Sequence, residues 1–134
     1  MNRTVAMTTA AALIAAPLAA VATVATASPA SADVTKRGAC GPGTYEFQVD
    51  REDREDGGGF EVSADLDRVT PGSRWTVVLK HDGKRIAKVT RTADREGDID
   101  VDVDRPNTRG PDQFRFKAFP AGGGPKCAAT ITVR

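Results

Sequence analysis

The stretch RWTVVLK at positions 74–80, followed by HDGK at 81–84, decides the fold that this sequence predicts. Large apolar residues fall at every second position of this stretch: Trp75, Val77 and Leu79. This is the two-residue period of a strand with one buried face. The Asp-Gly pair at 82–83 favours a type I′ turn, because both central residues of that turn need positive φ. We therefore expect a hairpin in which Lys80 faces Arg85.

Short strands are expected on both sides of this hairpin, and no amphipathic helix is indicated. Seven segments have strand patterns: 45–49, 60–66, 74–80, 85–92, 98–104, 114–118 and 127–133. The alternation breaks between Ile86 and Val89, which indicates either a bulge or a change of partner from one sheet to the other. Trp75 is the one tryptophan of the chain. On a strand within such a set, it is expected at the centre of a β-sandwich core.

Residues 1–32 have the pattern of a secretory signal peptide. Arg3 supplies the positive start, residues 11–24 are apolar, and Ala30-Ser31-Ala32 offers a cleavage site. A membrane anchor is the competing interpretation, but Pro17 and the weakly apolar alanines disfavour a stable span. We expect a cleaved leader and one secreted domain at 33–134, with no membrane span after cleavage. About 100 residues is a common size for a domain with one core.

Two cysteines, Cys40 and Cys127, remain in the expected mature chain. After export such a pair is most simply a disulfide, since a metal site needs three or four ligands and His81, the one histidine, is expected in the hairpin turn. The chain has 19 Lys and Arg against 18 Asp and Glu, and Arg3 is the one charged residue of the leader. The mature protein is therefore formally neutral, which disfavours nucleic acid as a partner.

Strands at this spacing, with Trp75 on the third, resemble an immunoglobulin-like or fibronectin type III-like domain. The chain is also similar to small secreted proteins of GC-rich bacteria, which are rich in Ala, Arg, Asp, Gly and Val. The resemblance implies an all-β, seven-stranded antiparallel immunoglobulin-like β-sandwich. It also implies a binding or structural module and no particular chemistry.

Residues for catalysis are scarce. Ser63 and Ser73 are the only serines after the leader, and His81 is the one histidine. Ser63 falls within a strand and Ser73 at a strand start, so a Ser-His-Asp site is disfavoured. Carboxylates are frequent, but they fall at exposed alternating positions, whereas a glycosidase pair needs a cleft with one buried acid. We expect no enzyme activity and no cofactor.

The alternating acids Asp98, Asp100, Asp102 and Asp104 raise the question of calcium. Residues on the same face of a strand lie roughly 6.6–6.8 Å apart, whereas calcium needs six to eight oxygens at about 2.3–2.6 Å. Four carboxylates in an extended row cannot all reach one ion. A loop site stays open, using Asp104 with Asp112, or Asp94 with Glu96 and Asp98. We expect that no metal is required.

Sorting the outward residues by sheet predicts a bipolar molecule. One sheet, from the first, second and fifth strands, would present only acids: Glu46, Asp50, Glu61, Asp65, Asp98, Asp100, Asp102 and Asp104. The other, from the third, sixth and seventh strands, would present only bases: Arg74, Lys80, Arg115, Lys117 and Arg134. The alternative is that the strand at 85–92 brings Arg85, Lys88 or Arg91 beside the aspartates and neutralises them.

Two function classes follow from these patterns. The first is a non-catalytic secreted module whose five predicted basic residues bind an anionic envelope polymer or an acidic protein partner by charge. The second is a small secreted enzyme inhibitor in which an exposed loop, at 110–113 or 120–125, enters an enzyme's cleft. A rigid, protease-resistant loop favours the inhibitor, and a salt-sensitive interaction over a whole face favours the module.

Overall fold

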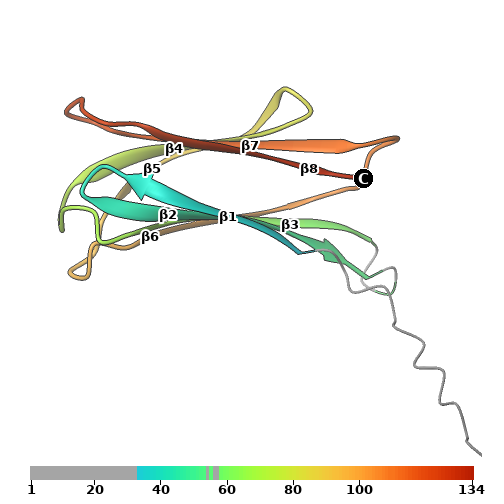
Figure 1. Cartoon of the computed structure of the whole chain (residues 1–134), viewed down its shortest axis with the longest axis horizontal. Coiled ribbons are helices and arrows are strands. Elements are labelled where there is room, and N and C mark those ends of the chain that lie inside the picture. The colour runs from blue at the N-terminus through green and yellow to red at the C-terminus, as the bar shows by residue number, and fades with distance from the viewer. Residues whose placement is uncertain (1–32, 54, 56–57) are drawn as a thin grey trace, which may run out of the picture.

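The computed structural model describes residues 33–53, 55 and 58–134, and it folds into two packed layers of strands (Figure 1). Its eight strands are β1 (Val34–Cys40), β2 (Gly43–Glu52), β3 (Gly59–Asp67), β4 (Arg74–His81), β5 (Lys84–Thr92), β6 (Ile99–Arg105), β7 (Asp112–Pro120) and β8 (Cys127–Val133). One four-stranded sheet, here sheet A, has the order β1-β2-β3-β6, and the other, sheet B, has the order β5-β4-β7-β8. All neighbouring strands are antiparallel.

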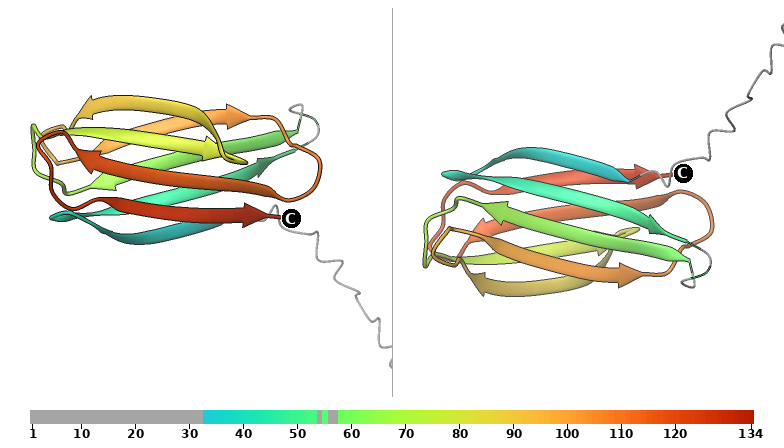
Figure 2. Two further views of the ribbon diagram at one scale, coloured as in Figure 1. Left: turned by 90° about the horizontal axis from the view of Figure 1, so that it is seen from above. Right: turned by 90° about the horizontal axis from the view of Figure 1, so that it is seen from below.

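The all-β sandwich predicted from the sequence is confirmed, with eight strands where seven were expected. The additional strand is β1, which pairs on one side only, with β2. Such an edge strand needs no alternating apolar pattern, and residues 35–37 are all polar. Six of the other strands fall into the two sheets as predicted, and β5, whose sheet was left open, joins sheet B. Figure 2 shows sheet B from above and sheet A from below.

The core lies between the sheets and is centred on four phenylalanines. Phe60 of sheet A contacts Phe114 of sheet B edge to face, with ring centroids 5.1 Å apart. Phe47 of sheet A likewise contacts Phe116 of sheet B, but these two rings are stacked, with centroids 5.5 Å apart. Trp75 is buried too, but it lies at the start of β4, where a Cβ on Gly41 would come within 3.3 Å of its ring. Trp75 therefore closes one end of the core, Phe47 and Phe116 lie in its middle, and Phe60 and Phe114 lie towards the end at His81.

The hairpin forms as the Asp-Gly pair predicts. Asp82 and Gly83 have positive φ, at 49° and 81°, and Lys80 pairs with Arg85. The register of β4 and β5 then shifts between Leu79 and Lys80, which is the predicted bulge. Strand β5 stays beside β4 in sheet B and does not pair with β6. Two bases of β5, Arg85 and Lys88, therefore point outward on sheet B together with Lys80.

The predicted disulfide is confirmed. Cys40 ends β1 and Cys127 begins β8, with their Cα atoms 5.0 Å apart. The bond joins an edge strand of sheet A to an edge strand of sheet B. Disulfides persist in oxidising compartments, so this bond is typical of an extracellular or other oxidising environment.

The eight described strands, the core and the disulfide lie within residues 33–134. The expected leader, residues 1–32, lies outside the described residues. Within the described part, no helix is long and apolar enough to cross a membrane.

Candidate functional site

The outer face of sheet B carries six exposed basic side chains. Because Trp75, Val77 and Leu79 point into the core, the residues that alternate with them and their cross-strand partners point outward. The outward bases are Arg74, Lys80, Arg85, Lys88, Arg115 and Lys117. All four strands of sheet B are described, and no Asp or Glu shares this surface. We call these six residues the basic face.

Two rows of the basic face run across neighbouring strands. Lys80 pairs with Arg85 on one side and with Arg115 on the other. Two residues along β4, Val78 is flanked in the same way by Lys88 and Lys117. Directly opposed like charges on neighbouring strands destabilise a sheet by roughly 0.2–1 kcal/mol per pair. Sheet B therefore carries this repulsion on its surface.

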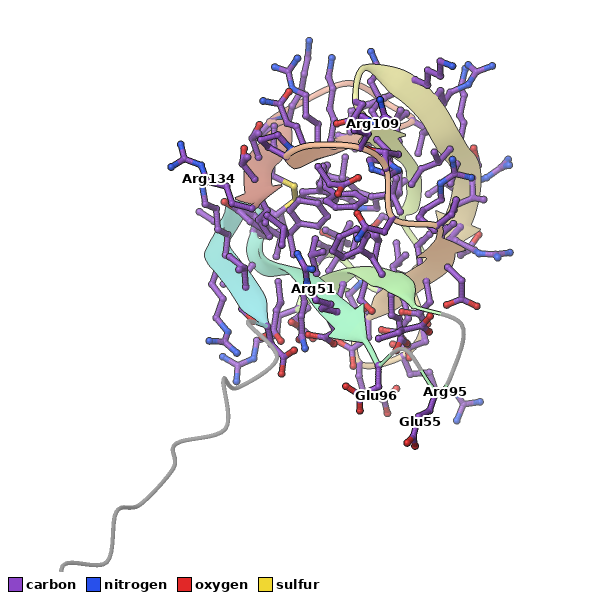
Figure 3. The ribbon with its side chains drawn as sticks, turned by 90° about the vertical axis from the view of Figure 1, so that its right-hand side faces the viewer. Arg51, Glu55, Arg95, Glu96, Arg109 and Arg134 are labelled. Carbon is purple, nitrogen blue, oxygen red and sulfur yellow. A yellow bond between two sulfur atoms is a disulfide. The ribbon has the colours of Figure 1, made fainter. Side chains whose placement is uncertain are left out.

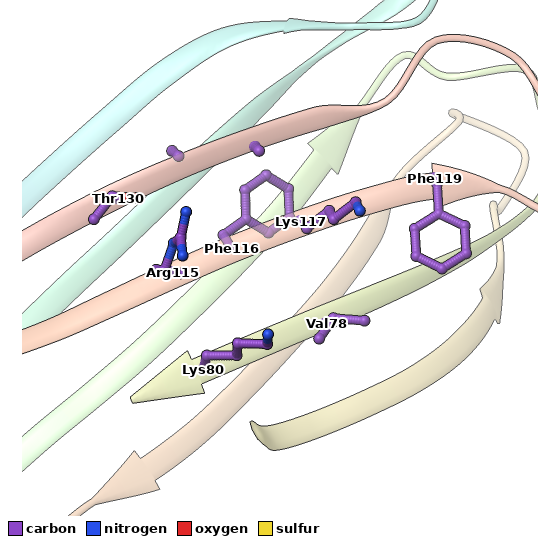
Figure 4. A pocket seen from close by; sticks show the side chains of 9 residues that line it. Val78, Lys80, Arg115, Phe116, Lys117, Phe119 and Thr130 are labelled. Carbon is purple, nitrogen blue, oxygen red and sulfur yellow. The ribbon is translucent and has the colours of Figure 1, made fainter. Parts of the chain in front are cut away.

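A shallow hollow of about 380 Å³ lies among these bases (Figure 4). Lys80, Arg115 and Lys117 line it together with the apolar side chains of Val78 and Phe119. The ammonium nitrogen of Lys117 lies 5.8 Å from the centroid of the Phe119 ring, within range of a cation–π contact. The hollow can hold an anionic group over an apolar floor, but it is too open to enclose a small ligand.

The structure brings together three of the five bases predicted as a binding surface. Lys80, Arg115 and Lys117 surround the hollow, whereas Arg74 lies six residues along β4 from Lys80, a distance of roughly 20 Å. Arg134 follows β8 and lies at the edge of the sandwich (Figure 3), where its carbonyl oxygen accepts a hydrogen bond from Arg51. It does not line the hollow.

Arg85 and Lys88 belong to the basic face, although the sequence did not decide which of the two sheets their strand joins. The bulge at β5 decides their direction, because the register shift lets Arg85 and Lys88 both pair with outward residues of β4. The broken alternation after Ile86 was the signal for this bulge. It did not show which sheet the strand joins.

The outer face of sheet A is acidic, as predicted. We define the acidic face by its outward carboxylates: Glu46, Asp50, Glu61, Asp65, Asp67, Asp100, Asp102 and Asp104, with Asp98 just before β6. Two rows of acids cross three strands without interruption, Glu46-Asp65-Asp100 and Asp50-Glu61-Asp104. Figure 3 shows carboxyl oxygens gathered on this side and basic tips along sheet B.

One base of β1 reaches the acidic face. The Nε of Arg37 lies 2.6 Å from a carboxylate oxygen of Glu46, and both side chains are partly exposed. In the described part of the chain, the other carboxylates of this face have no ion-pair partner. The bipolar surface predicted from the sequence therefore survives the addition of β1. Arg85 and Lys88 face outward on sheet B, and in the described residues no base of β5 forms an ion pair with the aspartates of β6.

The electrostatic consequence is clearest at two aspartates. Burial, with smaller contributions from Asp100 and Asp102, raises the pKa of Asp65 from 3.8 to about 6. Burial and then the charge of Asp98 raise the pKa of Asp67 above its usual value as well. Each carboxylate is therefore harder to ionise, first because it is partly buried and then because its neighbours on this face are negative.

His81 corrects one expectation from the sequence, since it is buried and not exposed in the turn. It is the last residue of β4, and its ring stacks on Phe114 with centroids 4.3 Å apart. Its Nε2 lies 2.6 Å from a carboxylate oxygen of Asp112, which is equally buried. The same oxygen accepts hydrogen bonds from the backbone N–H and the hydroxyl of Thr108. This network fastens the loop before β7 to the end of β4.

The network also contains the described residues best placed to hold a metal ion. One atom each from His81, Asp82 and Asp112 lie within 4.8 Å of one another. However, Asp82 accepts a hydrogen bond from the N–H of Gln113, and His81 is bonded to Asp112, which also accepts from the Thr108 hydroxyl. These polar atoms therefore already have partners within the protein, as a structural network requires.

The arrangements considered for catalysis and calcium are not assembled here. The Ser73 hydroxyl accepts from the Trp75 indole N–H and donates to the Thr70 carbonyl oxygen. Ser63 lies on the outer face of sheet A, so neither serine of the described chain is bonded to His81. Asp94 accepts two backbone N–H groups of its own loop. Asp112 is buried with His81, on the opposite side of the sandwich's core from the outward Asp104.

Comparison with protein-family models, with curated proteins and with solved structures finds no match to this chain. The surface chemistry of the chain therefore carries the functional argument, because a sandwich architecture by itself does not imply a function.

Proposed function

We propose that this protein is a non-catalytic binding module of an oxidising, extracytoplasmic environment, and that its basic face binds an anionic polymer of the cell envelope. The observation that carries the proposal is the set of six exposed bases on one sheet surface without an acid among them. A surface of one sign concentrates counter-ions and charged partners near it.

The spacing of the bases fits a linear polyanion better than a compact ligand. Lys80 and its row neighbours repeat at the strand separation of about 4.8 Å, and the next row lies roughly 6.8 Å along the strands. A chain of phosphate groups can lie along such rows and engage several bases in succession. The shallow hollow at Lys117 and Phe119 offers contact but no enclosure. Affinity should therefore come from charge and fall steeply with salt.

The test uses oxidised protein of residues 33–134 and a linear polyglycerol phosphate, with dextran as the uncharged polymer. Binding is followed by fluorescence titration from about 20 to about 300 mM salt. If four phosphates are engaged, the affinity should fall roughly 100-fold or more over a tenfold rise in salt. Arg115→Glu with Lys117→Glu should abolish binding.

A matched control keeps the same change in net charge but moves it off the basic face. Lys36→Glu with Arg95→Glu reverses two exposed bases outside sheet B and should leave most of the binding. Binding that ignores salt, or that responds equally to both double variants, contradicts the proposal.

The inhibitor alternative makes a different prediction in the same experiment. Its candidate loops, at 110–113 and 120–125, lie at the two ends of β7 and not on the outer face of sheet B. An inhibitor acting through either loop makes no use of the basic face, so it predicts that the wild-type protein binds polyglycerol phosphate no better than dextran. Polymer binding that is lost when Arg115 and Lys117 are reversed therefore favours the binding module.

A further inference from the structure

The acidic face has no role in polymer binding, and it lies on the opposite outer surface of the sandwich from the basic face (Figures 1 and 3). We propose that the acidic face of one molecule binds the basic face of a second copy, so that the protein assembles into head-to-tail stacks. This inference uses the basic face but does not depend on polymer binding.

The two faces carry opposite charges at the same spacing, which is the spacing of residues on a β-sheet. On the acidic face, Glu46, Asp65 and Asp100 form one row across three neighbouring strands. On the basic face, the row of Arg85, Lys80 and Arg115 also crosses three neighbouring strands. Strand separation is about 4.8 Å in both sheets, so apposed rows can place each carboxylate opposite a base.

Each face also carries like-charge repulsion that a second copy would relieve. Arg37, paired with Glu46, is the one base that forms an ion pair with the acidic face in the described chain. The pKa of Asp65 is raised by burial first and by Asp100 and Asp102 next, which is consistent with repulsion among the carboxylates of the acidic face. Bases brought over Asp65 and Asp102 would favour the ionised carboxylates, and the same contact would relieve the repulsion between Lys80 and its neighbours.

The size of the faces predicts a weak contact. Four strands of about seven residues cover roughly 20 by 24 Å, or about 500 Å² per partner. The total of about 1,000 Å² lies at the low end for specific interfaces, which predicts transient association. Because the faces lie on opposite sides, each added copy presents a new free face. Such a heterologous contact does not close on itself, so growth should continue beyond the dimer.

Sedimentation velocity of oxidised residues 33–134 tests the stack. At about 20 mM salt, where screening is weak, the average mass should rise with concentration past the dimer, and at about 300 mM salt the protein should be monomeric. Arg115→Glu with Lys117→Glu reverses two charges of the basic face, and Asp65→Lys with Asp102→Lys reverses two charges of the acidic face. Each double variant alone should be monomeric at low salt.

An equimolar mixture of the two double variants gives the decisive readout. One variant keeps an intact acidic face and the other keeps an intact basic face, so the mixture should form a heterodimer through these two faces although neither component associates alone. Circular dichroism verifies the fold of each variant. If the Asp65→Lys with Asp102→Lys variant does not fold, Asp65→Asn with Asp102→Asn replaces it and should weaken association at least tenfold.

Two results would overturn the stack: wild-type protein that stays monomeric at low salt, or association that persists when Asp65 and Asp102 are reversed. Neither result bears on polymer binding, because the Asp65→Lys with Asp102→Lys variant keeps the whole basic face and should still bind polyglycerol phosphate. Loss of that binding in a folded variant would count against the proposed function and not against the stack.

Discussion

Asp65 is flanked by Glu46 on one strand and by Asp100 on the other, so its nearest cross-strand neighbours are both acidic. Its pKa is raised to about 6, by burial first and by the neighbouring aspartates next. A carboxyl with a raised folded-state pKa destabilises the fold when it is ionised. The penalty is complete above about pH 6 and disappears as the pH falls towards the ordinary value of 3.8.

The variant Asp65→Asn should therefore stabilise the protein near neutral pH. We expect a gain of about 1 kcal/mol in the free energy of unfolding, after allowing for solvent screening of a partly exposed group. The gain should shrink between about pH 6 and about pH 4, because protonation then removes the same charge in the wild type. Urea denaturation at several pH values measures it. Asp33→Asn, an exposed acid before β1, should have little effect, and an equal gain in both variants would refute the explanation.

The burial of His81 and Asp112 could have been predicted from the alternation of their strands, but their contact with each other could not. His81 continues the inward alternation of Trp75, Val77 and Leu79, and Asp112 likewise precedes the inward Phe114. Alternation alone therefore placed both side chains in the core. Because His81 directly precedes the Asp-Gly pair, it was assigned to the predicted turn. No local pattern indicated that β4 and β7 place His81 and Asp112 at the same end of sheet B.

At the scale of strands, alternation predicted most of the elements, and the grouping supposed for six of them agrees with the two sheets. Strands with one buried face have a clear two-residue period, which is why β2, β4, β6 and β7 were recognisable. Strand β1 was missed because an edge strand with residues 35–37 polar has no such period. Whether β5 pairs with β4 or β6 also stayed open, since pairing across a bulge depends on contacts distant in sequence.

The link between β1 and β8 gives a prediction at this scale. Replacing both cysteines with serine, Cys40→Ser with Cys127→Ser, opens a loop with a sequence separation of 87 residues. The chain-entropy account predicts a loss of about 4–5 kcal/mol in the free energy of unfolding. Urea denaturation should give similar values for this variant and for reduced wild type. A loss below about 1 kcal/mol would mean that β1 is held by its pairing with β2 and needs no disulfide.

At the scale of the whole molecule, the composition does not reveal that acids and bases lie on opposite faces. The chain has 19 bases and 18 acids, and a nearly neutral protein offers no overall attraction for a polyanion. Folding separates the charges, because alternation assigns each outward residue to a face and the topology collects acidic and basic strands in different sheets. The separation was predictable as soon as the strands were sorted. The immunoglobulin-like resemblance stays a prediction.

The most direct test of this charge separation uses paramagnetic cosolutes in solution NMR. An anionic and a cationic nitroxide of similar size are compared at about 20 mM salt, where a charged surface concentrates the probe of opposite sign. Backbone amides at Lys80, Arg115 and Lys117 should relax faster with the anionic probe, and those at Asp65 and Asp102 faster with the cationic probe. Both differences should fade at about 300 mM salt. Equal relaxation of the two faces by either probe at low salt would contradict the bipolar surface and, with it, the proposed function.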